Sequence, residues 1–319
     1  MTERKRITIV TPCYNEELNV RELHRRTRAV MDALPQYEYR HIFIDNASHD
    51  GTVAVLRAMA AEFPEIQVIV NARNFGHLRS PMHAFLEADG DAIGFICADL
   101  QEPPELFTEL LARWEEGFPI VAAVKTSSEE SGLMYRIRSS YYNLVGRLTD
   151  VQVISHFTGF GIYDRNVVEI LKQNFRDPYP YFRGMIAEMG FPHAEVAYNQ
   201  AARWRGITKN NFYTLYDLAM LGITNLSKVP LRLVTAAGFV FAAISFVLGL
   251  FYFIYKIVFW DSFSLGVAPL VLGLFFLGSV QLLCLGIIGE YVGSIHTFVQ
   301  NRPLVIEKER INFPERSSS

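Results

Sequence analysis

Cysteine is scarce in this 319-residue chain, and neither sign of charge is in large excess. The three cysteines, Cys13, Cys97 and Cys284, are too few and too widely spaced for a disulfide framework or a zinc site. With 30 Lys and Arg against 33 Asp and Glu, the net charge of -3 argues against a nucleic-acid binder, because such domains are usually basic. We therefore expect no nucleic-acid partner.

The N-terminus lacks the pattern of a secretory signal peptide. Residues 1–6 are basic, but the apolar stretch 7–10 is too short for the hydrophobic segment of such a peptide and runs into Pro12. The residues before the first long apolar run are therefore expected to stay in the cytosol, where thiols need not pair.

Two long stretches carry no charge at all. Residues 233–255 and 262–289 contain no charged side chain, although charged residues make up 20% of the chain. As helices rising ~1.5 Å per residue, both would exceed the ~30 Å hydrocarbon core of a membrane. Buried core helices of this length and composition are rare, so we expect two transmembrane spans. The short link 256–261 makes them a hairpin, and together they explain the mean hydropathy of +0.15.

Basic residues on the flanks predict the orientation of this hairpin. The connecting loop offers only Lys256 against Asp261, whereas both outer ends are basic. The positive-inside rule then places both termini, and the residues before the first span, on the cytoplasmic side. The flanking basic residues are Lys228 and Arg232 before the first span, and Arg302, Lys308 and Arg310 after the second.

Short β-rich runs alternate with helical stretches over the first 125 residues. Such alternation predicts an α/β fold with a mostly parallel sheet and helices on both faces. Ligands of such sheets bind beyond the carboxyl ends of the strands. We expect strands at 7–11, 39–45, 67–71, 92–98 and 120–124, and helices at 16–34, 51–62, 78–88 and 104–115.

Oxygen-bearing side chains follow four of these strands. They lie in the segments 11–16, 45–52, 71–76 and 97–105. Turn and helix-capping chemistry would explain any one segment, but four at successive strand ends point to a ligand site. Carboxylates and carboxamides there suit Mg²⁺ or Mn²⁺, and such a cation would neutralise a diphosphate.

On these residues the chain resembles family 2 glycosyltransferases of the dolichyl-phosphate mannose synthase-like branch, which includes bacterial polyprenyl-phosphate glycosyltransferases. The resemblance rests on Pro12-Cys-Tyr-Asn-Glu16, on Asp99-Leu-Gln-Glu-Pro-Pro-Glu105, and on Gly286-Ile-Ile-Gly-Glu-Tyr-Val-Gly293 followed by Asn301-Arg-Pro303. It implies a Rossmann-like GT-A fold with a two-helix transmembrane hairpin. It also implies inverting transfer of a sugar from a nucleotide-sugar donor, UDP-linked by preference, to a polyprenyl phosphate of the undecaprenyl type in cell-envelope glycan modification.

The resemblance also implies roles for individual positions. Asp99 and Gln101 would hold the Mg²⁺ or Mn²⁺ cofactor, and Asp99 and Arg203 are the candidate catalytic residues. Four residues would line the nucleotide pocket: Pro12, Tyr14, Glu16 and Asp45. The candidates for binding the acceptor phosphate or the donor diphosphate are Lys125, Arg136, Ser140, Arg183, Arg203 and Lys209.

The chain departs from the family pattern at three positions. Cys97 and Asn46 stand where the family usually has aspartate, and a thiol is a poor ligand for Mg²⁺. Gly159 stands where an acidic active-site residue is usual. The reaction does not require a base there, because a phosphate acceptor is already an anion near neutral pH. His156 lies beside the altered segment and could replace the missing polar group, although a structural or merely exposed histidine is the alternative.

These patterns predict four segments. They are a cytosolic GT-A domain over 1–212, an amphipathic juxtamembrane segment over 213–231, a hairpin over 232–300 with spans at about 233–257 and 264–290, and a cytosolic tail over 301–319. The protein is thus expected in the inner or plasma membrane, and two-span members of the family often form homo-oligomers through the hairpin.

Two other functions stay open. One is a catalytically silent membrane scaffold or lipid-binding homologue, which the departures at Cys97 and Gly159 would support. The other is a processive polysaccharide synthase, because Gln200-Ala-Ala-Arg203-Trp204 resembles the Gln/Arg-x-x-Arg-Trp motif of such enzymes.

Overall fold

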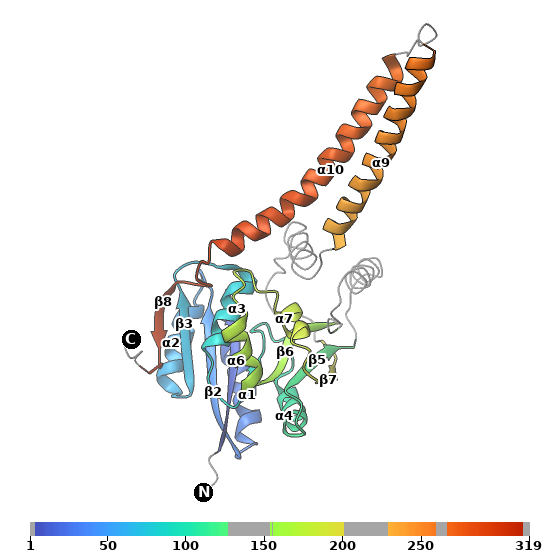
Figure 1. Ribbon diagram of the computed structural model, residues 1–319. Coiled ribbons are helices and arrows are strands. Elements are labelled where there is room, and N and C mark those ends of the chain that lie inside the picture. The colour runs from blue at the N-terminus through green and yellow to red at the C-terminus, as the bar shows by residue number, and fades with distance from the viewer. Residues whose placement is uncertain (1–3, 127–153, 155, 201–228, 260–266, 315–319) are drawn as a thin grey trace. The chain divides into compact units, whose positions relative to one another are not determined.

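The structure is a computed structural model of the 319-residue chain, and it describes residues 4–126, 154, 156–200, 229–259 and 267–314 (Figure 1). The chain forms two compact units. The first comprises Met1–Asn143, Val151–Leu215 and Asn301–Ser319, and the second comprises Leu144–Asp150 and Tyr216–Gln300. The first unit contains a mixed sheet with helices, and the second contains two long apolar helices.

An eight-stranded sheet organises the first unit. Its strands are β1 Lys5–Cys13, β2 Tyr37–Asp45, β3 Ile66–Asn71, β4 Ala92–Phe95, β5 Ile120–Lys125, β6 Phe157–Asp164, β7 His193–Tyr198 and β8 Glu307–Ile311. They lie in the order β7-β5-β6-β4-β1-β2-β3-β8 (Figure 1). Neighbours β4, β1, β2 and β3 run parallel, as do β5 and β7, whereas β6 and β8 are antiparallel to their neighbours. The expected mostly parallel sheet is therefore confirmed in its central part.

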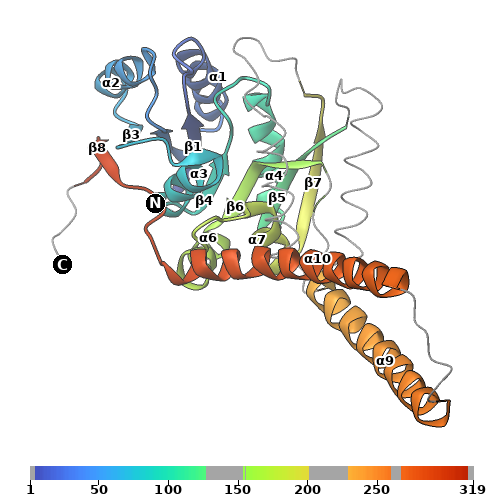
Figure 2. The ribbon, with the colours of Figure 1, turned by 90° about the horizontal axis from the view of Figure 1, so that it is seen from above.

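Helices cover both faces of this sheet, as the alternating pattern predicts (Figure 2). They are α1 Val20–Asp32, α2 Thr52–Glu62, α3 Gly76–Glu87, the 3₁₀ helix η1 Pro104–Leu106, α4 Phe107–Glu115, α6 Arg165–Asn174 and α7 Phe182–Glu188. Buried side chains of α1, α2 and α4 belong to one core cluster, and those of α3, α6 and α7 to another. The two clusters lie on opposite faces of the sheet, so the middle of β1, from Ile7 to Thr11, is buried on both sides.

Local signals explain where two of these helices begin. The Asp50 carboxylate accepts a hydrogen bond from the Thr52 main-chain N–H at 3.0 Å and so satisfies a free donor at the start of α2. Pro104 opens η1, where its missing N–H costs nothing. In contrast, α1 begins at Val20 rather than at the expected residue 16, because residues 16–19 form a turn in which the Asn19 N–H donates to the Glu16 carbonyl at 2.9 Å.

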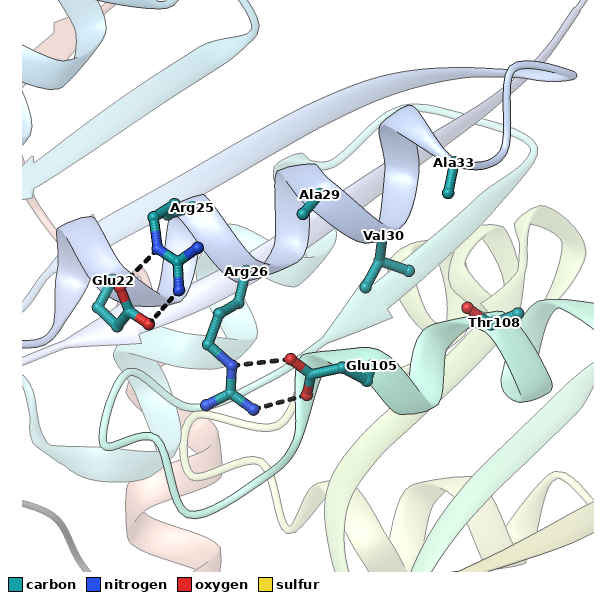
Figure 3. Close-up of a pocket in the computed structure, with 8 residues that line it drawn as sticks. All are labelled: Glu22, Arg25, Arg26, Ala29, Val30, Ala33, Glu105 and Thr108. Atoms are coloured by element: carbon teal, nitrogen blue, oxygen red, sulfur yellow. Dashed lines mark hydrogen bonds and ion pairs between the residues drawn. The ribbon is translucent and has the colours of Figure 1, made fainter.

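An ion pair joins α1 to η1 on the outside of the sheet (Figure 3). Arg26 donates two hydrogen bonds to the two carboxylate oxygens of Glu105, at 2.8 and 2.6 Å. The pair borders an open depression of about 560 Å³ between the helices, which also includes Glu22 and Thr108. This exposed pair links η1, which follows the fourth strand, to α1, which follows the first.

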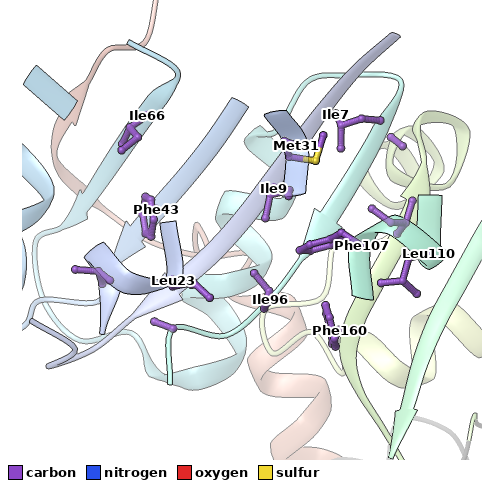
Figure 4. Packing of buried hydrophobic residues seen from close by; sticks show 14 of the residues in the cluster. Ile7, Ile9, Leu23, Met31, Phe43, Ile66, Ile96, Phe107, Leu110 and Phe160 are labelled. Atoms are coloured by element: carbon purple, nitrogen blue, oxygen red, sulfur yellow. The ribbon is translucent and has the colours of Figure 1, made fainter. Parts of the chain in front are cut away.

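The larger apolar core lies between the sheet and the helices α1, α2 and α4 (Figure 4). Leu23 of α1 and Phe107 of α4 are fully buried there, together with Ile9 and Phe43 from the sheet. Phe107 meets Phe160 of β6 edge to face with ring centroids 5.5 Å apart. Complete burial of a side chain of this size stabilises the fold by about 1.5–3 kcal/mol.

The C-terminal segment is part of the sheet. Strand β8 pairs antiparallel with β3, with Ile311 opposite Val68 and Arg310 opposite Ile69. The pairing continues beyond the strand, because the Ala72 N–H donates to the Ile306 carbonyl at 2.9 Å. The tail therefore covers the edge of β3 and reaches the loop that follows it.

The second unit contains two long apolar helices, α9 Val229–Val258 and α10 Val267–Val299. Their segments Val229–Tyr255 and Gly273–Val299, each of 27 residues, are long and apolar enough to cross a membrane by length and composition. The helices touch, since the rings of Phe241 and Phe276 meet edge to face at 6.1 Å. Most of the expected juxtamembrane segment 213–231 lies outside the described residues.

Candidate active site

The carboxyl ends of three adjacent parallel strands carry most of the predicted site residues that the structure describes. β1 lies between β2 and β4. The chain first adds β2 and β3 on one side of β1 and then places β4 on the other side. In α/β sheets such a position leaves a crevice beyond the strand ends where ligands bind. Cys13, Asp45 and Phe95 end these three strands.

The loops after β1 and β2 hold one another in place. The Asn15 main-chain N–H donates to the Ser48 hydroxyl at 2.8 Å, and the Asn15 side chain accepts from the His49 N–H at 2.8 Å. The Tyr14 ring meets the His49 ring edge to face at 6.3 Å. The Glu16 N–H donates to the Thr52 hydroxyl at 2.9 Å. The structure thus brings the expected nucleotide residues Tyr14 and Glu16 together with the loop after β2.

Asp45 is fully buried at the end of β2. Its carboxylate accepts hydrogen bonds from the Ser48 main-chain N–H, at 2.9 Å, and from the Ser48 hydroxyl. Burial raises the pKa of Asp45, and the bonds from Ser48 lower it in part. The side chain therefore shapes the loop after β2, while Pro12, one residue before the end of β1, is partly exposed beside it.

Asn46, which departs from the family pattern, uses both ends of its side-chain amide. Its Nδ2 donates to the Asn74 side chain at 3.1 Å and to the Gly76 carbonyl at 3.0 Å. Its Oδ1 accepts from the Asn71 side chain at 3.2 Å and from the Phe75 N–H at 2.9 Å. An aspartate could not donate, so the amide is what joins the end of β2 to the loop after β3.

The segment after β4 forms the candidate metal turn, which we define as residues Cys97–Gln101. Leu100 takes a left-handed conformation with φ of 59°, and the Asp99 carboxylate accepts from the Gln101 N–H at 3.2 Å. Burial raises the pKa of the Cys97 thiol well above its usual range, so it is a neutral thiol rather than a thiolate. The strand expected over 92–98 ends at Phe95, because the chain turns here.

The residues of this turn fit a cation that arrives with a diphosphate. No three His, Cys, Asp or Glu side chains gather as a metal site within the residues that the structure describes. Mg²⁺ is usually held by one or two carboxylates together with substrate phosphates. The Asp99 carboxylate and the Gln101 amide match that mode, with the remaining oxygens left to the nucleotide.

Three of the predicted cationic or polar candidates gather around the start of β6. The Lys125 N–H, at the end of β5, donates to the His156 carbonyl at 3.3 Å. The Arg183 guanidinium, in α7, donates to the Phe157 carbonyl at 3.1 Å and lies 5.7 Å from the Tyr181 ring. His156 itself takes a left-handed conformation with φ of 56°. Four other candidates, Arg136, Ser140, Arg203 and Lys209, lie outside the described residues.

Gly159, where the family usually has an acid, adopts a backbone that disfavours any other residue. Its φ is +107°, and an added Cβ would contact the rings of Phe95 and Phe182 at 3.6 Å. Space is sufficient but the conformation is strained for an L side chain. The structure therefore gives a physical reason for the missing acid.

Glu102 is a site residue that sequence reasoning missed. It is 3% exposed, and its carboxylate accepts from the Cys97 N–H at 3.0 Å and from the Thr158 hydroxyl at 2.7 Å. It lies in the motif that carries the resemblance, but a glutamate in a polar run reads as solvent-exposed. Its burial depends on β6, which is 55 residues further along the chain.

Comparisons with known proteins identify the family of the chain. The chain matches Glycosyl transferase family 2 over residues 8–171 and the GtrB C-terminal hairpin over residues 229–295. An uncharacterised glycosyltransferase, YkcC, of Bacillus subtilis (strain 168) is 34% identical over 307 residues, which cover 96% of this chain and 94% of that protein. The SfII prophage-derived bactoprenol glucosyl transferase of Shigella flexneri is 32% identical over 305 residues, covering 95% and 98% respectively.

A solved structure shows the same fold. Glucosyl-3-phosphoglycerate synthase from Mycobacterium tuberculosis, in complex with Mn²⁺, UDP-glucose and phosphoglyceric acid, superposes with a TM-score of 0.50 at 18% identity. The match covers 69% of this chain and 78% of that chain. The mixed sheet with its two helical layers is thus a GT-A-like fold. The chain belongs to glycosyltransferase family 2, and it is a glycosyltransferase.

Proposed function

We propose that the protein transfers one sugar, with inversion, from a UDP-linked donor to a polyprenyl phosphate at the cytoplasmic face of a membrane. The observation that carries this proposal is the placement of Asp45 at the end of β2 and of Asp99 and Gln101 beyond the end of β4, on either side of β1. This is where a nucleotide diphosphate and its cation would lie in a sheet of this topology.

Similar proteins support the acceptor and the donor. The Shigella flexneri relative is named a bactoprenol glucosyl transferase, and its similarity extends over almost the whole of both chains. The Mycobacterium tuberculosis enzyme that shares the fold was solved with Mn²⁺ and UDP-glucose. The name of the first supports a lipid acceptor, and the ligands of the second support a nucleotide-sugar donor and a divalent cation.

The reaction needs positioned charges more than a base. One oxygen of the acceptor phosphate, already an anion near neutral pH, would attack the anomeric carbon. The bond from that carbon to the donor diphosphate breaks as the new bond forms, and its electron pair leaves with the diphosphate. A divalent cation held by Asp99 and Gln101 would neutralise that leaving group. The chain itself would align the two phosphates and exclude water.

Cationic side chains of this chain would hold the acceptor. Lys125 and Arg183 are the described candidates, and both lie next to the first residues of β6. A fixed cation at the attacking phosphate reduces its repulsion from the donor diphosphate without the need to remove a proton. The absence of an acid at Gly159 is consistent with this reaction.

The apolar helices match a lipid-linked acceptor. Helices α9 and α10 are each long enough to span a bilayer, and the basic residues at their outer ends predict that both termini are cytoplasmic. A hairpin of this kind would keep the sugar transfer near the membrane surface, where a polyprenyl phosphate is found. Self-association through the hairpin stays a prediction from the family resemblance.

The proposal is tested with the full chain in nanodiscs, a polyprenyl phosphate, Mg²⁺ or Mn²⁺, and a panel of UDP- and GDP-linked sugars. We expect one donor to yield a glycolipid. We expect Asp99→Ala to reduce its rate by about 100-fold or more, because the metal contributes several kcal/mol. Asp32→Ala removes an exposed carboxylate of α1 and serves as the matched control. No glycolipid with any donor, together with no nucleotide binding, would refute the proposal.

A further inference from the structure

Glu102 is a buried carboxylate placed directly behind the candidate metal turn. It is 3% exposed, and the charge of Lys125 lowers the pKa of Glu102 only in part against the effect of burial. A buried carboxylate is costly unless hydrogen bonds compensate for the lost water. Here one oxygen accepts from the Cys97 N–H at 3.0 Å and the other from the Thr158 hydroxyl at 2.7 Å. The structural contribution of the Glu102 side chain therefore lies in these two hydrogen bonds.

The two hydrogen bonds connect two of the three segments in which the chain departs from its family. Cys97 begins the metal turn, and Thr158 directly precedes Gly159 in β6. β4 and β6 pair only from Ala92 to Phe95, so the main-chain ladder ends before the turn begins. Beyond the ladder, the Glu102 side chain is a direct link between the metal turn and β6.

We propose that Glu102 is a positioning residue that holds the metal turn against β6, so that Asp99 and Gln101 keep their oxygens directed toward the nucleotide diphosphate. The inference rests on the proposed function. The turn needs such support because Leu100 has a φ of 59°, a left-handed conformation that is strained for a bulky residue. Fixing the main chain at Cys97, two residues before Asp99, restricts the direction of the Asp99 carboxylate.

The Cys97 N–H requires an acceptor, whereas the Thr158 hydroxyl could donate or accept, so the bond to Cys97 is the one that depends most on the carboxylate. The Cys97 N–H can only donate, and a carboxylate accepts at both oxygens with roughly twice the strength of a neutral acceptor. Glu102→Gln keeps the shape of the side chain but replaces one acceptor by an NH₂ donor. Thr158→Val removes the second bond from the other side and leaves Glu102 in place. Neither substitution alters Asp99 or Gln101.

The test is Mn²⁺ binding to the full chain in detergent with UDP present, followed by electron paramagnetic resonance of the free ion. We expect Glu102→Gln to weaken Mn²⁺ binding about 10- to 100-fold, as is typical for a residue that orients a metal ligand. Thr158→Val should weaken it in the same direction. The double variant should be no worse than Glu102→Gln, because both act through one connection. Glu109→Gln changes an exposed glutamate of α4 and should bind Mn²⁺ like the wild type.

A purely structural role would give a different result. In that case Glu102→Gln would lower the melting temperature while its Mn²⁺ affinity, measured well below that temperature, stays at the wild-type value. That result would overturn the inference, and so would unchanged affinity in a fully stable variant. If Glu102→Gln does not fold, the Mn²⁺ affinity of Thr158→Val serves as the test, and a wild-type affinity in that variant would overturn the inference. A wild-type protein that binds UDP but no Mn²⁺ would overturn the proposed metal dependence together with this inference.

Discussion

Acid is expected to destabilise the first unit through two buried histidines. His24 of α1 and His41 of β2 are 2% and 0% exposed, and their Nδ1 atoms lie 3.2 Å apart. His41 also contacts the Tyr39 hydroxyl at 2.7 Å and the Thr11 hydroxyl at 2.9 Å. Two protonated rings at this distance would repel each other, and the nearest carboxylate, Glu65, lies 3.9 Å from His24 and is already paired with Arg28. The pair is therefore built for neutral rings.

The sign and size of the effect follow from the pKa values. Burial lowers the pKa of His24 from 6.5 to about 4, and that of His41 well below 6.5. Below pH 6.5 the unfolded chain binds protons that the native state does not. The stability that the two neutral histidines contribute is therefore complete above pH 6.5 and is lost as the pH falls toward 4. At pH 5.5 His24 alone accounts for about 1.4 kcal/mol, and His41 acts in the same direction.

The assay is thermal unfolding of the full chain in detergent at pH 7.5 and pH 5.5. A loss of 1.4 kcal/mol corresponds to a melting temperature about 3–6 °C lower in a unit of this size. Burial raises the pKa of Asp45 and Glu102, which acts in the opposite direction, so the comparison must be made between variants. Between pH 7.5 and pH 5.5 the melting temperature of His24→Gln should fall less than that of the wild type. The melting temperature of the control His193→Gln, at an exposed position, should fall as much as that of the wild type. Equal decreases in all three proteins would refute this reasoning.

Replacing Cys97 by aspartate should keep or raise activity with Mg²⁺, because a carboxylate is a harder ligand than a thiol; a folded but inactive variant would show that the thiol has a role of its own. Gly159→Asp should lower the melting temperature by several degrees, because a side chain at φ of +107° costs about 1–3 kcal/mol. Scanning fluorimetry would detect this, and higher activity at unchanged stability would contradict it. Arg310→Ala removes hydrogen bonds to Glu87 and Glu307 and should cost about 1–3 kcal/mol and expose β8 to protease. Digestion at the wild-type rate would argue against this role of the tail.

The parallel centre of the sheet could be predicted because its information is local. Apolar runs ending in polar residues mark β1, β2 and β3, and the alternation with helices then determines their parallel pairing. The strand after residue 92 was expected to reach 98 but ends at Phe95. Ile96 and Ala98 are buried and apolar, so composition alone does not distinguish them from a strand.

Features that depend on distant partners could not be predicted. The segment Glu307–Ile311 begins with four charged residues of alternating sign, which is typical of a polar tail. It nevertheless forms the edge strand β8 by pairing with β3, more than 230 residues earlier. Charges are common on edge strands, so they do not exclude one. Glu102 was missed for the same reason, because its hydrogen bond to Thr158 exists only once β6 is in the sheet.

The departure at Asn46 shows how structure changes the interpretation of a substitution. From the sequence it is a lost carboxylate beside Asp45. In the structure its amide both donates and accepts, and it connects the end of β2 to Asn74 and Phe75. The residue therefore supports the shape of the candidate nucleotide site.

The most direct test of the proposed reaction is the mass of the lipid product. Undecaprenyl phosphate is incubated with the full chain, Mn²⁺ and an isotopically labelled nucleotide sugar, and the lipid fraction is analysed by mass spectrometry. We predict a lipid phosphate carrying one labelled sugar, formed in equal amount with the released nucleoside diphosphate and lost in Asp99→Ala. A sugar polymer, or release of the nucleoside diphosphate with the lipid mass unchanged, would contradict the proposed reaction.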